Sequence, residues 1–142
     1  MNRTAEILLV EDDPVGVRLL QEAFKASQLP HRLQVVSDGS QALACLQGLS
    51  PYARAVRPDL LMLELNLPGK NGWEVLAELK ATPSLHSLPV ILLSEGLTAS
   101  DEAQRRALRP DLHLQKPQGL EAYFRLARTL GEFWPAFSRL RF

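Results

Sequence analysis

Short apolar runs alternate with amphipathic stretches along this chain. The runs comprise residues 7–10, 33–36, 60–63 and 90–93, with a weaker one at 112–114. Three of them are apolar at every position, which is typical of strands buried on both faces of a parallel sheet. The pattern therefore predicts five strands in an α/β fold.

The segments between these runs repeat apolar residues at the spacing of a helix surface. Val17, Leu20 and Phe24 recur three and four residues apart, and Asp13 and Pro14 supply an N-cap and a first-turn proline before them. Similar patterns predict a helix after each later run, the last over residues 120–130. Five β-α units with right-handed crossovers would form a doubly wound parallel sheet.

Composition adds limits on size, partners and compartment. The chain has 142 residues, of which 46% are hydrophobic, which fits one globular domain. Sixteen basic and sixteen acidic side chains cancel, so no overall field favours nucleic acid or an anionic membrane. The apolar runs are far shorter than the roughly 18 residues of a membrane span. We therefore expect a cytoplasmic protein, in which Cys45, the sole cysteine, is a small core residue.

Polar side chains end the predicted strands. Glu11 and Asp12 follow the first run, Glu64 the third, Ser94 the fourth, and Lys116 the fifth. Ligands of open α/β sheets bind outside the carboxyl ends of the strands, so these groups should share one crevice. Clustered carboxylates favour a hard cation such as magnesium, while a lysine and a hydroxyl bind phosphoryl oxygens. The alternative is that each is a solvated loop residue.

These motifs resemble the receiver domain of bacterial two-component response regulators. The matching segments, in order, are Ile7-Leu-Leu-Val-Glu-Asp-Asp-Pro14, Pro58-Asp-Leu-Leu-Met-Leu-Glu-Leu-Asn-Leu-Pro-Gly69, Asn71-Gly72, Leu88-Pro-Val-Ile-Leu-Leu-Ser94 and Lys116-Pro117. The resemblance covers nearly the whole chain. It implies a five-stranded parallel sheet of order 2-1-3-4-5.

The resemblance also implies roles for the crevice residues. Glu11 and Asp12 would hold magnesium, Glu64 would occupy the phosphoacceptor position, Ser94 would be the switch hydroxyl, and Lys116 would pair with phosphate. The Lys116–Pro117 bond would be the cis peptide of the family. A histidine kinase is the implied partner.

A narrower resemblance concerns two short segments. The loop with Pro51 and Tyr52, and the ending Glu132-Phe133-Trp134, are similar to small stand-alone receivers of the cyanobacterial phytochrome type. A phytochrome is therefore one candidate for the kinase.

Glu64 departs from the family pattern because a receiver carries an aspartate there. Its extra methylene moves the carboxylate outward by about 1.5 Å, more than the ~1 Å misplacement that can cost ~100-fold in rate. We therefore expect a poor phosphoacceptor and weak or absent magnesium binding. Glu64 could instead reach toward Lys116 and Ser94 and hold an active-like state, or it could be a tolerated loss of function.

His113 and Arg109 are two further departures. His113 stands where the family has an aromatic switch residue, and it is either a hydrogen-bonding switch or a half-exposed strand histidine without a special role. Arg109 and Pro110 replace a turn of small residues, which should stiffen the start of the last strand.

The end of the chain is rich in aromatic residues. Phe133, Trp134, Phe137 and Phe142 are four of the nine in the sequence, and Pro135 is expected to break the preceding helix. We therefore predict a receiver domain over residues 1–131 and a tail over 132–142. The tail should pack on its own domain or, as we expect, support a homodimer.

Together these features predict a single-domain receiver in phosphorelay signalling that acts by docking to proteins and is not an enzyme. Two alternatives stay open. One is a phosphate-independent pseudo-receiver scaffold, and the other is a magnesium-dependent phosphohydrolase.

Overall fold

Five strands alternate with five helices in the part of the chain that the computed structural model describes, residues 4–53 and 56–139. For residues 133 and 135–139 it describes only the helical backbone. The strands are β1 (Ala5–Val10), β2 (His31–Val36), β3 (Leu60–Glu64), β4 (Val90–Ser94) and β5 (Leu112–Gln115). The helices are α1 (Pro14–Ala26), α2 (Gly39–Leu46), α3 (Gly72–Ala81), α4 (Ala99–Leu108) and α5 (Leu120–Arg139). Each predicted strand and helix is present.

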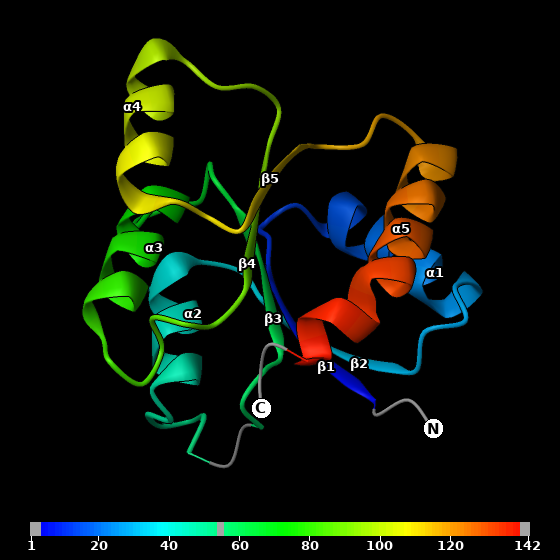
Figure 1. Cartoon of the computed structure of the whole chain (residues 1–142), viewed down its shortest axis with the longest axis horizontal. Helices are drawn as coiled ribbons and strands as arrows, with labels where there is room; N and C mark the ends of the chain where they lie inside the picture. Colours follow the sequence, from blue (N-terminus) through cyan, green and yellow to red (C-terminus); the bar gives the residue numbers. More distant parts are fainter. Residues whose placement is uncertain (1–3, 54–55, 140–142) are drawn as a thin grey trace.

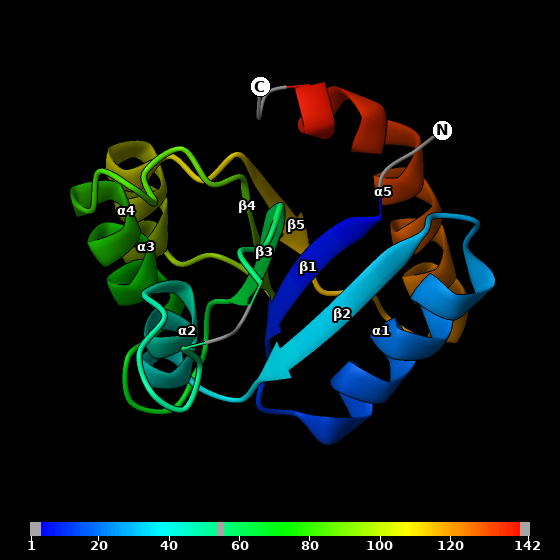
Figure 2. The ribbon, with the colours of Figure 1, turned by 90° about the horizontal axis from the view of Figure 1, so that it is seen from below.

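All strand pairs are parallel, in the order β2-β1-β3-β4-β5, which confirms the predicted topology. Helices α1 and α5 cover one face of the sheet, and α2, α3 and α4 cover the other (Figure 1). Figure 2 shows the sheet between these two layers. Every residue of β3 and β4 is buried, because these strands lie inside the sheet and are covered on both faces.

Each face of the sheet has its own core. Leu61 and Leu63 of β3 contribute to the cluster beneath α2 and α3, which also contains Cys45 as predicted. Leu60 and Met62 contribute to the cluster beneath α1 and α5. This alternation follows from the two-residue period of a strand.

The beginning of α1 follows the predicted capping. The Asp13 side chain accepts a hydrogen bond from the Val15 amide at 3.0 Å, and Pro14 is the first helical residue. Asp13 therefore acts as a helix cap, as its position in the sequence indicates.

Helix α5 does not end at Pro135, so that part of the prediction is wrong. The helix continues to Arg139, and Figure 2 shows its last turns bending relative to its first part. A proline inside a helix costs about 3 kcal/mol because it removes one hydrogen bond and clashes with the preceding turn. Trp134 is buried in the cluster beneath α1 and α5, and burial of a large apolar side chain contributes about 1.5–3 kcal/mol in return.

The structure describes no side chain for the other aromatic residues of the predicted tail. Phe142 is not among the described residues, and only the backbone of Phe133 and Phe137 is described. Of the tail's aromatic side chains, Trp134 alone is placed, and it packs on its own domain.

The predicted cis bond at Lys116–Pro117 is also wrong. Among the described peptide bonds, the cis one is Ser50–Pro51. Trans is the favoured isomer of a bond preceding proline by about 0.5–1 kcal/mol. From this backbone the Lys116 side chain reaches Glu11 and Glu64. The Lys116 amide donates a hydrogen bond to the Ser94 carbonyl at 2.7 Å.

None of the helices in the described part of the chain is long and apolar enough to span a membrane.

Candidate functional site

The carboxyl ends of three strands bring Glu11, Glu64 and Lys116 together. The Lys116 Nζ atom lies 2.7 Å from Glu11 Oε1 and 3.4 Å from Glu64 Oε2. Glu11 follows β1 and Glu64 ends the adjacent β3, so the two carboxylates start side by side. Lys116 follows β5, and its long side chain extends past β4 to reach them.

All three side chains are largely removed from water. Exposed fractions are 6% for the Glu11 side chain, 5% for Glu64 and 15% for Lys116. Ion pairs in such surroundings are only weakly screened by solvent and salt. We call these three residues the Glu-Lys-Glu triad.

The remaining carboxylate oxygens are unequally satisfied. Glu11 Oε2 accepts a hydrogen bond from the Asp12 amide at 3.1 Å, and Glu64 Oε1 accepts one from the Asn66 amide at 3.4 Å. Glu64 Oε2 is buried and accepts no hydrogen bond from any residue that the structure describes. One ammonium thus faces two carboxylates, and Glu64 is the less well compensated of the two.

This imbalance sets the protonation of the triad. Burial raises the pKa of Glu64 to about 7; the Lys116 charge opposes that shift and the Glu11 charge adds to it. Burial alone would lower the pKa of Lys116, but its hydrogen bond to Glu11 and the charges of Glu64 and Glu11 outweigh burial and raise it. Lys116 therefore stays charged, while Glu64 is about half protonated near neutral pH.

Two residues that the sequence analysis missed enclose the triad. A Cβ atom on Gly16 of α1 would lie 3.0 Å from Glu11 Oε1 and 3.7 Å from the Tyr123 hydroxyl. A larger residue at this position of α1 would therefore force the Glu11 carboxylate to shift by a few tenths of an ångström. Tyr123 of α5 is buried beside them, and that burial raises its pKa. The available signal was a glycine inside a predicted helix, where it costs about 1 kcal/mol relative to alanine.

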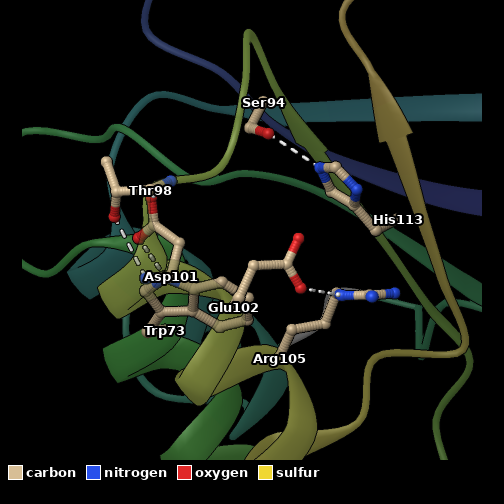
Figure 3. A network of polar contacts seen from close by, with 7 residues as sticks. All are labelled: Trp73, Ser94, Thr98, Asp101, Glu102, Arg105 and His113. Carbon is tan, nitrogen blue, oxygen red and sulfur yellow. Dashed lines mark hydrogen bonds and ion pairs between the residues drawn. The ribbon is translucent and has the colours of Figure 1, made fainter.

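Ser94 and His113 form a separate pair. Ser94 Oγ lies 2.7 Å from His113 Nε2, and Figure 3 shows the hydroxyl directed at the imidazole. Burial lowers the pKa of His113 and the charge of Arg105 lowers it further, with Glu102 opposing. His113 thus has a specific partner, whereas Glu64 contacts Lys116 but has no hydrogen bond to Ser94 among the described contacts.

Asp12 does not join the triad. It is exposed, whereas Glu11 and Glu64 are buried and directed at Lys116. In the described part of the chain, no group of three or more acidic, histidine or cysteine side chains lies close enough to hold a metal ion. Of the carboxylates at this crevice, Glu11 and Glu64 are therefore engaged by Lys116, and Asp12 faces solvent.

A five-stranded parallel sheet of this order, with acids and a lysine at the carboxyl ends of its strands, defines a class of signalling domain. Residues 7–128 match the family of the response regulator receiver domain, and the chain belongs to that family. It is thus a receiver domain of two-component signal transduction.

Individual relatives narrow the comparison. The chain is similar to response regulator Rcp1 of Synechocystis sp., with 39% identity over 128 residues that cover 90% of this chain and 87% of Rcp1. The crystal structure of the phosphorylated cyanobacterial phytochrome response regulator RcpA superposes with a TM-score of 0.86 at 40% identity, covering 94% of this chain and 96% of RcpA. The Mn²⁺-bound form of Rcp1 gives a TM-score of 0.83 at 38% identity, covering 92% and 94% of the two chains.

Proposed function

We propose that this receiver acts by docking to other proteins, with Glu64 at the phosphoacceptor position and its crevice closed by the Glu-Lys-Glu triad. The observation that carries this proposal is the double pairing of Lys116. The ammonium that would bind a phosphoryl group is already engaged by Glu11 and Glu64. A phosphoryl group would have to displace at least one of these carboxylates.

Three properties of Glu64 disfavour phosphoryl transfer. Its carboxylate extends about 1.5 Å beyond that of an aspartate, it is buried, and its pKa of about 7 leaves half of it protonated near neutral pH. A protonated carboxyl group is a poor nucleophile. The acceptor is therefore misplaced and only partly ionised.

Magnesium binding should be weak or absent for a related reason. To bind magnesium, Glu11 and Glu64 would have to release Lys116, which is fixed in the protein, and take up a hydrated cation instead. Asp12 is exposed and does not lie in the triad. The Mn²⁺-bound form of Rcp1 is the comparison here, since that relative binds a divalent cation.

The phosphate-independent scaffold stays the alternative. In that version the triad serves stability alone, and the crevice has no effect on docking. Disruption of the triad by Lys116→Met discriminates the two, because it should change partner affinity only if the state of the crevice governs docking.

A magnesium-dependent phosphohydrolase is less well supported. Its nucleophile or acid would have to be reached by a substrate, yet Ser94 is completely buried and occupied by His113. We therefore treat the protein as a non-enzymatic receiver.

The partners follow from the relatives. RcpA is described as a cyanobacterial phytochrome response regulator, and a histidine kinase, with a phytochrome as candidate, is the partner we propose for this chain. A homodimer through residues 132–142 and a cytoplasmic location are parts of the same proposal.

The experiment is phosphorylation by acetyl phosphate with magnesium, followed by intact-mass spectrometry. The wild-type protein should carry no stable phosphoryl adduct. Glu64→Asp should acquire one, because Lys116 and Ser94 stay in place and the shorter carboxylate regains the acceptor position. Glu64→Gln is the control that should stay unmodified, and an adduct mapped to Glu64 of the wild type would overturn the proposal.

A further inference from the structure

A pocket of about 670 Å³ lies between α1 and α5, which cover the face of the sheet opposite to α4 (Figure 1). Its volume falls in the range of about 300–1,000 Å³ that is typical of small-molecule sites. It is found where α1 ends and β2 begins, so it is separate from the triad at the carboxyl ends of the strands. Most of its lining is apolar or small, namely Ala23, Ala26, Leu29, Pro30, Phe124 and Gly131. We call it the α1-α5 pocket.

One wall of this pocket is held in place by hydrogen bonds. The Leu29 amide donates to Ser27 Oγ at 3.4 Å, and His31 Nδ1 lies 2.9 Å from the Leu29 carbonyl. The Ala5 amide of β1 donates to the Pro30 carbonyl at 2.8 Å. The segment between α1 and β2 is therefore anchored to the sheet, and the pocket is preformed, as small-molecule sites usually are.

Gly131 belongs to the opposite wall, inside α5. A Cβ atom at this position would lie 3.6 Å from the Leu29 Cβ atom, which is an ordinary contact. Gly131 is also not among the glycines with a positive φ, so neither packing nor backbone conformation requires a glycine here. A glycine destabilises the interior of a helix relative to alanine. What it provides here is space, because a long side chain at this position would extend into the pocket.

Two charges of opposite sign stand at the rim of the α1-α5 pocket. Arg128 and Glu132 both line it, and both are exposed. They lie one helical turn apart with the cation first, which is the less favourable order for an ion pair along a helix. Neither forms an ion pair with any residue that the structure describes. A ligand with a single charge would be attracted by one of these side chains and repelled by the other.

We propose that the α1-α5 pocket binds a free amino acid with a large apolar side chain. Its carboxylate would pair with Arg128 and its ammonium group with Glu132. Its side chain would pack against Leu29 and Phe124, in the space beside Gly131. A free amino acid carries both charges on one carbon and so matches both rim charges at once, whereas the end of a protein chain carries only one of them.

The test is a titration of the ¹⁵N-labelled protein with L-phenylalanine, followed by NMR. We expect saturable shifts of the Leu29, Phe124 and Gly131 amides, with a dissociation constant at or below about 1 mM. N-acetyl-L-phenylalanine lacks the ammonium group and L-phenylalaninamide lacks the carboxylate. Each should bind about fivefold more weakly, which is the effect of losing one exposed ion pair. L-alanine, which lacks the apolar body, should cause no saturable shifts.

Charge variants assign the two rim residues. Arg128→Gln and Glu132→Gln should each weaken binding of L-phenylalanine about threefold to fivefold. The matched controls are Arg125→Gln and Glu121→Gln, which remove exposed charges of the same helix that do not line the pocket. Both controls should bind L-phenylalanine as the wild type does.

Two further variants fill the pocket from opposite walls. Gly131→Leu should abolish binding from the side of α5. Ala26→Phe should abolish it from the side of α1, and because Ala26 is exposed this variant should keep the fold even if Gly131→Leu perturbs α5.

Several results would overturn the inference. One is the absence of saturable shifts in the wild type up to about 10 mM L-phenylalanine. Others are equal binding of the three phenylalanine compounds, or binding that both filled variants retain. Self-association that Ala26→Phe abolishes, without binding of L-phenylalanine, would assign the pocket to a second copy of the chain. A phosphoryl adduct on wild-type Glu64 would instead overturn the proposed role of Glu64 and leave this site standing.

Discussion

Lys116 places one positive charge between two buried carboxylates. The crevice therefore holds one cation for two anions, and its chemistry depends on how the second carboxylate is stabilised. Glu11 has the shorter contact, at 2.7 Å, and Glu64 has the longer one, at 3.4 Å. The second carboxylate can be stabilised only by protonation, by a further cation or by exposure to water. Burial raises the pKa of Glu64 to about 7, which favours protonation of this carboxylate.

The stability of the protein should therefore fall as pH rises through 7. The pKa of Glu64 is about 7 when folded, against 4.5 for an ordinary glutamate. Because the pKa is higher in the folded protein, the stabilisation that protonated Glu64 provides is fully present below pH 4.5. It is lost as pH rises through about 7. The difference between 4.5 and about 7 corresponds to a contribution to the free energy of unfolding on the order of 3 kcal/mol.

Urea denaturation between pH 5 and pH 8 measures this effect. Glu64→Gln removes the titrating group and should flatten the pH dependence of the free energy of unfolding relative to wild type. Glu78→Gln, at an exposed position, is the control and should leave the slope unchanged. Identical slopes for wild type and Glu64→Gln would contradict the raised pKa.

At the scale of elements, local sequence signals predicted most boundaries. The apolar runs located all five strands, and Asp13 and Pro14 located the start of α1. The end of α5 could not be predicted, because its extension past Pro135 accompanies the burial of Trp134 beneath distant parts of the chain. Gly16 was missed because its role depends on the contact with Glu11, which follows β1, and not on the pattern of α1 itself.

Trp134→Ala should therefore destabilise the domain itself. Truncation of a buried large aromatic side chain typically costs about 3–5 kcal/mol. Leu120→Ala, at an exposed position of the same helix, should cost much less. Chemical denaturation of the two variants measures the difference, and a Trp134→Ala variant as stable as wild type would mean that the end of α5 contributes nothing to the core.

At the scale of the whole molecule, topology brings the site together. The resemblance to receiver domains implied the strand order, and the convergence of Glu11, Glu64 and Lys116 could be predicted because parallel strands share one carboxyl edge. It was not sufficient to predict that Lys116 would contact both carboxylates while Asp12 and Ser94 lie outside the triad. Those details depend on side-chain packing between α1, α5 and the sheet.

We propose that Lys116 supplies the charge that a divalent cation would otherwise provide. Calorimetric titration with magnesium tests this proposal, using wild type, Lys116→Met and the control Lys70→Met, which removes a half-buried lysine paired with Glu78. We predict no binding below the millimolar range for wild type and Lys70→Met. Lys116→Met should gain magnesium binding or fold only when magnesium is present, because Glu11 and Glu64 then lack a counter-charge. Submillimolar binding by the wild type, or a folded Lys116→Met variant that ignores magnesium, would contradict the claim.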